Sequence, residues 1–207
     1  MSPAATTNKT TKNGSANKNS KKFPVKRLEE LTNSERSKII DPLTIFGLLP
    51  MRVYHHIADI GCGPGYFSIP LAKYAFDGKI YAVDVQQKML DALEEHTREV
   101  RLSNVSLILS KESKIPIDDD SIDGAILVNS LHESSKPADL LKETIRLLRR
   151  GGWAAIIDWR KEKMEFGPPV AARLARETAV KFAEAAGFRV QSVYDLNEWE
   201  YIILLSA

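Results

Sequence analysis

Short apolar runs alternate with amphipathic segments along most of the chain. Apolar runs bounded by glycine or polar residues predict buried strands at 57–60, 80–84, 105–109, 122–129, 153–158, 188–193 and 201–205. Apolar residues at helical spacing predict helices at 27–40, 43–48, 66–75, 87–101, 137–148 and 173–186. Strands separated by helices favour a parallel sheet that is covered on both faces. The last two strands have no helix between them and should pair as an antiparallel hairpin.

The first 22 residues differ from the rest in composition. They are rich in Ser, Thr, Asn, Lys and Ala and have no large apolar residue after Met1. Such a segment cannot bury enough surface to offset its ordering entropy, so we predict a disordered basic tail at 1–22. A solvated tail is favoured over contact with nucleic acid or anionic lipid. We expect a helical cover at 23–50 and the main domain at 51–207.

Length and composition fit one ordinary globular domain. The chain has 207 residues, of which 43% are hydrophobic, and its net charge of +2 predicts no special partner. No apolar run is long enough for a membrane span, and the start of the chain lacks the apolar core of a signal peptide. Cys62 is the single cysteine, which excludes an intrachain disulfide and suits the cytoplasm. No metal site is expected, because the acidic run 118–120 fits a solvated turn better.

Three glycines at alternate positions follow the first predicted strand. Gly61, Gly63 and Gly65 read G-x-G-x-G, with Asp59 two residues before the first of them. Glycine serves where the backbone needs a positive φ or must approach a ligand closely. A dinucleotide fingerprint reads G-x-G-x-x-G, and Tyr66 stands here in place of its third glycine. The turn therefore predicts a site for a small polar ligand other than a dinucleotide.

A second acidic residue closes the next predicted strand. Asp84 follows Gly65 by nineteen residues. That separation fits an acid that accepts hydrogen bonds from ribose hydroxyl groups. The two features together predict a ligand that contains a ribose.

These residues resemble the class I S-adenosylmethionine-dependent methyltransferases, and within them the small ubiquinone- and menaquinone-biosynthesis-like enzymes. Further similarity lies at 121–123 before the fourth strand, at 147–152 before the fifth and at 158–162 after it. The resemblance implies a single-domain Rossmann-like α/β fold. It also implies a seven-stranded, mostly parallel sheet with an antiparallel C-terminal strand. The implied cofactor is S-adenosyl-L-methionine, with S-adenosyl-L-homocysteine as product.

The resemblance also implies a set of cofactor-binding residues. They are Asp59, Gly61, Cys62, Gly63, Gly65, Asp84, Val85, Glu112 and Asn129. In the family, an acid after the third strand holds the adenine amine, but Lys111 stands at that position here. Either Glu112 takes this task or backbone groups alone hold the adenine. Val85 is either an apolar wall for the adenine or an ordinary core residue.

His132 and Asp158 follow the fourth and fifth predicted strands and are the catalytic candidates. Methyl transfer from a sulfonium is an in-line displacement, so the protein mainly aligns the reactants. A base is needed only if the acceptor carries a proton at attack, and a histidine can serve near neutral pH. His132 could instead hold the next helix or contact the cofactor. Asp158 could orient the acceptor or hold its own loop.

The expected function is methyl transfer to a small-molecule acceptor. The loop after the fourth strand lacks the N-P-P-Y or D-P-P-Y signature of enzymes that methylate adenine or glutamine amino groups. The segments 27–50 and 161–174 contain apolar residues and could cover a partly apolar acceptor. Two alternatives stay open: methylation of RNA or protein, and cofactor binding without turnover. The sequence leaves the oligomeric state undetermined.

Overall fold

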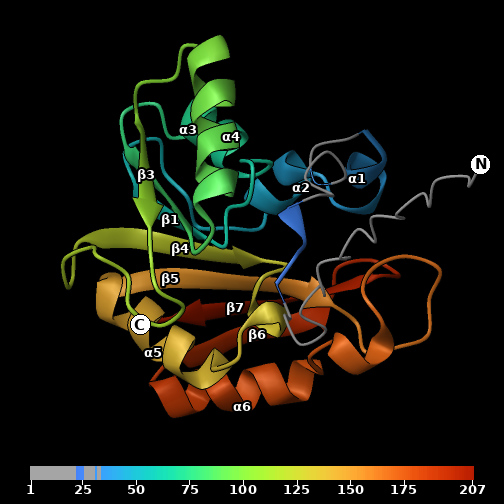
Figure 1. Cartoon of the computed structure of the whole chain (residues 1–207). Helices are drawn as coiled ribbons and strands as arrows, with labels where there is room; N and C mark the ends of the chain where they lie inside the picture. Colours follow the sequence, from blue (N-terminus) through green and yellow to red (C-terminus); the bar gives the residue numbers. More distant parts are fainter. Residues whose placement is uncertain (1–21, 26–30, 32–33) are drawn as a thin grey trace, which may run out of the picture.

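The computed structural model describes residues 22–25, 31 and 34–207. The predicted tail at 1–22 therefore lies almost entirely outside the described residues, as does most of the first half of the helix predicted at 27–40. Figure 1 shows a central sheet with helices packed above and below it. No helix within the described ranges is both long enough and apolar enough to cross a membrane.

The sheet has seven strands in the order β3-β2-β1-β4-β5-β7-β6. Strands β1 to β5 pair in parallel, and β7 runs antiparallel to both β5 and β6. The predicted fold class and the predicted antiparallel hairpin of the last two strands are thereby confirmed. The strands are β1 (His56–Ile60), β2 (Lys79–Asp84), β3 (Val105–Leu109), β4 (Ile122–Val128), β5 (Leu148–Trp159), β6 (Arg189–Asp195) and β7 (Glu200–Ser206).

The helices are divided between the two faces of the sheet (Figure 1). They are α1 (Ser34–Ile39), α2 (Pro42–Phe46), α3 (Ser68–Tyr74), α4 (Gln87–Glu99), α5 (Pro137–Leu147) and α6 (Arg176–Ala186). Residues of α2 and α3 pack with Ile57 and Ile157, whereas residues of α5 and α6 pack with the alternate strand positions Ala58 and Ile156. Because successive strand residues face opposite sides, uninterrupted apolar strands supply both cores.

Two boundaries differ from the sequence prediction for identifiable reasons. The fifth strand begins at Leu148 instead of residue 153, because Leu148 pairs with Ile122 before the register shifts around Gly152. The last helix begins at Arg176 instead of residue 173. Arg173 is buried in the preceding loop, where its guanidinium donates to the main-chain oxygens of residues 160, 162, 166 and 168. The predicted end of that helix is confirmed, since Gly187 takes the left-handed conformation with φ +105°.

The order of the strands places a crevice beside β1. The chain passes from β1 to β2 and β3 on one side, and then crosses back to β4 on the other. The loops after β1 and β4 therefore diverge at their carboxyl ends, which is where open α/β sheets bind ligands.

Candidate functional site

The glycine turn leaves β1 and leads into α3 at this crevice. All three glycines have positive φ, +78° at Gly61, +54° at Gly63 and +97° at Gly65. A Cβ at Gly61 would lie 2.5 Å from the Cβ of Ser130, and a Cβ at Gly65 would lie 2.2 Å from Leu93 Cδ1. At Gly63 the nearest described atom would be 3.6 Å away. Gly61 and Gly65 therefore permit close packing, whereas a Cβ at Gly63 would only touch the side chain of Leu31.

Asp84 lies at the end of β2, directly across from the glycine turn. Its carboxylate accepts hydrogen bonds from the backbone N–H of Gly63 at 3.0 Å and of Gln86 at 2.8 Å. Burial raises the pKa of Asp84, and these backbone donors offset part of that rise. The carboxylate thus ties the turn to the second strand and retains lone pairs for a further donor. Val85 beside it is half-buried.

Replacing Asp84 with alanine should weaken cofactor binding while leaving a folded protein. Losing hydrogen bonds to a charged group costs about 1.5–3 kcal/mol, so the dissociation constant should rise by roughly 10- to 150-fold. Calorimetric titration with S-adenosylhomocysteine measures this change. Asp91→Ala, at an exposed position on α4, is the matched control. Equal affinities in the two variants would contradict a ribose-binding role for Asp84.

Asp59 and Cys62 are buried beneath the turn. Asp59 accepts a 2.6 Å hydrogen bond from Ser68 Oγ, which joins β1 to the start of α3, and burial raises the pKa of Asp59 to about 7. Cys62 packs with Ala82, Leu90 and other apolar residues under α4. Burial raises the pKa of the Cys62 thiol well above its usual range, so the thiol stays protonated. Both side chains support the shape of the turn.

His132, in the loop after β4, and Asp158, near the end of β5, are brought together. His132 Nδ1 lies 2.7 Å from Asp158 Oδ1, and the backbone N–H of His132 donates to Oδ2 at 3.0 Å. Burial lowers the pKa of His132, but the hydrogen bond and charge of Asp158 outweigh burial, so the net shift is upward. A carboxylate at Nδ1 fixes the ring and leaves Nε2 as the nitrogen that can take a proton. The pair has the arrangement of an oriented general base.

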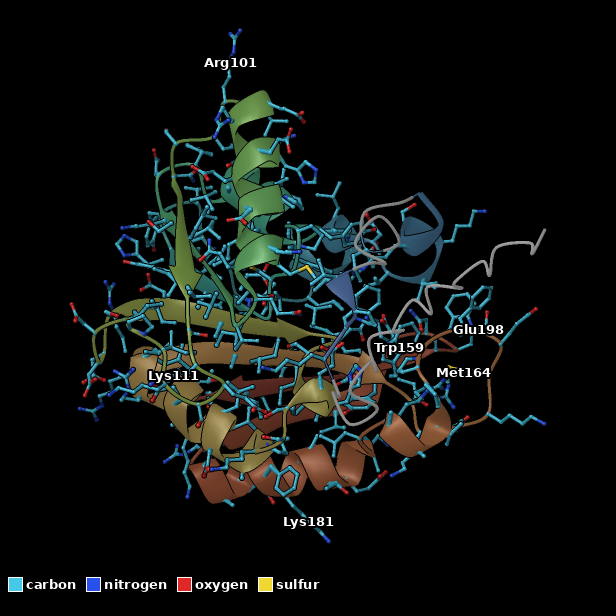
Figure 2. All side chains as sticks on the ribbon, in the orientation of Figure 1. Arg101, Lys111, Trp159, Met164, Lys181 and Glu198 are labelled. Carbon is cyan, nitrogen blue, oxygen red and sulfur yellow. The ribbon has the colours of Figure 1, made fainter. Side chains whose placement is uncertain are left out.

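Glu112 is turned toward the loop that leads into α5. Its carboxylate accepts hydrogen bonds at 2.8 Å from the hydroxyl groups of Ser134 and Ser135, and also from the backbone N–H of Ser135. Burial raises the pKa of Glu112, but these donors outweigh it and leave the pKa below its ordinary value. Figure 2 draws Lys111 well apart from Trp159, the last residue of β5. These contacts favour the alternative in which backbone groups hold the adenine.

Asn129 forms a buried polar pair with Glu200. Asn129 has φ +52°, and its Nδ2 donates to Glu200 Oε1 at 2.7 Å. Glu200 is fully buried at the start of β7, and burial raises its pKa to about 7. The sequence analysis did not identify Glu200 because it began the last strand at residue 201. An acid directly before an apolar strand was the available signal.

Replacing Glu200 with glutamine should make stability less dependent on pH. The folded wild-type protein keeps a proton on Glu200 up to about pH 7, whereas the unfolded chain releases it near 4.5. This contribution to stability therefore declines as the pH rises through that interval. The difference in Tm between pH 5 and pH 8 should shrink by about 3 °C or more in Glu200→Gln. Thermal unfolding of Glu198→Gln, at an exposed position, should keep the wild-type difference; an unchanged difference in Glu200→Gln would contradict the shift.

Two parts of the N-terminal segment also contact the site. The main chain of Phe23 donates to Glu133 Oε2 at 3.0 Å and accepts from Gln86 Nε2 at 3.3 Å, so it spans the loops after β2 and β4. The guanidinium of Arg36, on α1, lies 4.7 Å from the centre of the Tyr66 ring. Burial lowers the pKa of Arg36, and Glu200, Asp59 and Glu133 oppose that shift. Neither Phe23 nor Arg36 was among the site residues predicted from the sequence.

The fold, the glycine turn and the acid at the end of β2 define a Rossmann-like methyltransferase. A family model described as "Methyltransferase domain" matches residues 58–156. A crystal structure of an S-adenosylmethionine-dependent methyltransferase from Aquifex aeolicus superposes with a TM-score of 0.86 and 29% identity, covering 89% of this chain and 99% of that one. The chain has the fold of the class I S-adenosylmethionine-dependent methyltransferases, and the family and structural matches imply S-adenosylmethionine as its cofactor.

Curated relatives match over part of their length. The biotin biosynthesis bifunctional protein BioHC of Teredinibacter turnerae is 29% identical over 58% of this chain and 22% of its own length. The demethylmenaquinone methyltransferase of Listeria welshimeri is 30% identical over 50% of this chain and 44% of its own length. The chain thus spans less than half the length of these relatives.

Proposed function

We propose that the protein transfers the methyl group of S-adenosylmethionine to a small-molecule acceptor by in-line displacement. The observation that carries this proposal is the His132–Asp158 pair, which is held at 2.7 Å between the ends of β4 and β5. Similarity to a demethylmenaquinone methyltransferase and to a biotin biosynthesis protein supports a small acceptor.

Most of the predicted site residues have a role in this proposal. The turn of Gly61, Gly63 and Gly65, with Asp59 and Cys62 beneath it, would hold the methionyl end of the cofactor. Asp84 would hold the ribose, and Val85 would line the adenine. When bound, the cofactor supplies an electrophilic methyl group. The chain would align the acceptor with that methyl group, and His132, oriented by Asp158, would take the proton of an acceptor that carries one.

An assay with S-adenosylmethionine labelled in the methyl group tests the proposal. The protein is incubated with a panel of small hydroquinones, carboxylic acids, amines and thiols, and in parallel with total RNA and with total protein. We expect label to enter at least one small molecule. Label that enters only RNA or protein would contradict the proposal and favour a macromolecular acceptor. Cofactor binding with no transfer to any of them would favour a protein without turnover.

Removing residues 1–22 gives a second test that distinguishes a small-molecule acceptor from a macromolecular one. If the lysines of the tail tether RNA, the full chain should bind it with strong salt dependence and the shortened chain should not. For a small-molecule enzyme, the two forms should have the same Tm and the same cofactor affinity, since the tail has no large apolar residue after Met1 to contribute to a core.

A further inference from the structure

Glu200 carries a buried oxygen atom that has no donor. Its carboxylate is fully buried; Oε1 receives a hydrogen bond from Asn129 Nδ2, and the side chain of Asn197 also stabilises the ionised form. Oε2 has no hydrogen-bond partner among the described residues. Burying a carboxylate oxygen without a donor is costly, so such an atom marks a place where a donor from outside the chain can bind.

Asn129 provides a second acceptor of the same kind. Its amide orientation is fixed, because Nδ2 donates to Glu200 and the opposite orientation would place two oxygen atoms against each other. Asn129 Oδ1 is consequently the free end of the amide, and it too is buried without a partner in the described part of the chain. Two unpartnered acceptors on hydrogen-bonded side chains suit a group that donates more than one hydrogen bond.

The surrounding charge favours a positive group. Among the residues with described side chains, Arg36 faces three carboxylates, those of Glu200, Asp59 and Glu133. The charge of Asp158 also acts on Glu200 and raises its pKa. Burial raises the pKa of Asp59, Glu133 and Glu200, so a cation that binds beside them would favour their ionised forms over protonation.

The position of the pair distinguishes the acceptor side of the site from the cofactor side. The glycine turn and Asp84 lie on β1 and β2, whereas Glu200 begins β7, which lies on the far side of β4 and β5. Glu200 is paired in register with Trp159 at the end of β5. Figure 2 shows Trp159 near the point where the β5 arrow ends. The carboxylate thus lies at the start of β7, separated by β4 and β5 from the strands that lead to the glycine turn and Asp84.

We propose that Glu200 and Asn129 bind a protonated amine of the methyl acceptor. The inference rests on the proposed small-molecule function and narrows the acceptor to compounds that carry a cationic nitrogen with N–H donors. The amine can be either the methylated group or a second group that orients the acceptor. A bound ammonium group stabilises the ionised form of Glu200, which then supplies the charge, and Asn129 supplies a neutral acceptor whose direction Glu200 fixes.

Binding measured without turnover tests the proposal. The wild-type protein is saturated with S-adenosylhomocysteine and titrated with short alkyl and phenylalkyl primary amines. The alcohols and the trimethylammonium compounds of the same carbon skeletons are titrated in parallel. We expect at least one amine to bind about tenfold or more tightly than both of its counterparts, since the alcohol lacks charge and the quaternary nitrogen lacks N–H donors. This comparison needs no variant to fold.

Variants then locate the site. Glu200→Gln should weaken amine binding by about tenfold or more and leave S-adenosylhomocysteine affinity within about twofold. Glu198→Gln should change neither. Asn129→Gly, which keeps the positive φ accessible, should also weaken amine binding.

Several results would overturn the proposal. One is that no amine in the panel binds better than its alcohol. Another is that Glu200→Gln lowers the affinity for S-adenosylhomocysteine instead, which would assign the subsite to the ammonium group of the cofactor. Methylation of a hydroquinone or carboxylic acid that has no nitrogen would support the small-molecule function and contradict the proposed amine-binding site. Failure of the small-molecule function would show as label in RNA or protein, independently of the titrations.

Discussion

Replacing His132 with alanine should lower kcat by about 100-fold for an acceptor that loses a proton on methylation, because general-base catalysis contributes on that order. Cofactor affinity should stay within a few-fold, since the methionyl and ribose positions lie on β1 and β2. The wild-type rate should rise with pH through a pKa above 6.5, because Asp158 raises the pKa of His132 and the base acts unprotonated. Turnover across pH 5–9 and titration with S-adenosylhomocysteine measure the effects.

The control for this result is His55→Ala. His55 precedes β1 at the opposite end of the sheet and should keep wild-type turnover. If His132→Ala lowers kcat by less than tenfold and keeps the pH profile of the wild type, alignment of the reactants alone accelerates the reaction. His132 would then be a residue that holds the loop after β4 through its bonds to Asp158.

Gly63→Val should abolish measurable cofactor binding, with the dissociation constant raised by about 100-fold or more. Gly63 combines φ +54° with a would-be Cβ position whose nearest described neighbour is Leu31 Cδ1, at 3.6 Å. A valine would fill the space beside Asp84 that a ligand must enter, and it would strain the backbone that donates to that carboxylate. Calorimetric titration with S-adenosylhomocysteine reads the effect directly.

A second variant separates the effect of backbone strain from the effect of filling the ligand's space. Gly151 has φ +78°, and nothing lies within 4 Å of its would-be Cβ. Gly151→Val therefore carries a comparable strain at the other end of β5, far from the crevice. We expect it to lower Tm but to bind the cofactor normally. Similar cofactor affinities in the two folded variants would argue against close approach of the ligand at Gly63.

The periodicity of the sequence predicted the strands well because burial on both faces makes each strand an uninterrupted apolar run. The turn at 61–65 was also predictable, because positions with positive φ are most often occupied by glycine. Arg173 was not predictable in the same way. Its guanidinium satisfies the carbonyl groups of a loop that has no periodicity of its own, and this moved the start of α6.

The polar part of the candidate site depended on contacts between distant segments. Asn129 and Glu200 are separated by 71 positions, and Glu112 reaches Ser134 across 22. The family resemblance left open whether Glu112 or backbone groups hold the adenine, and the neighbouring loop supplies three donors to the Glu112 carboxylate. Which partner a carboxylate finds is decided by loop geometry, and a single sequence does not encode that in any local pattern.

Phe23 links the loops after β2 and β4 through main-chain atoms. Its hydrogen bonds to Glu133 and from Gln86 do not involve its side chain. Nearly any amino acid at position 23 can therefore form the same bridge, and proline alone among the ordinary residues would remove the donated bond. These main-chain hydrogen bonds can therefore be kept when residue 23 is substituted, and comparisons of side-chain identity at position 23 would not reveal them.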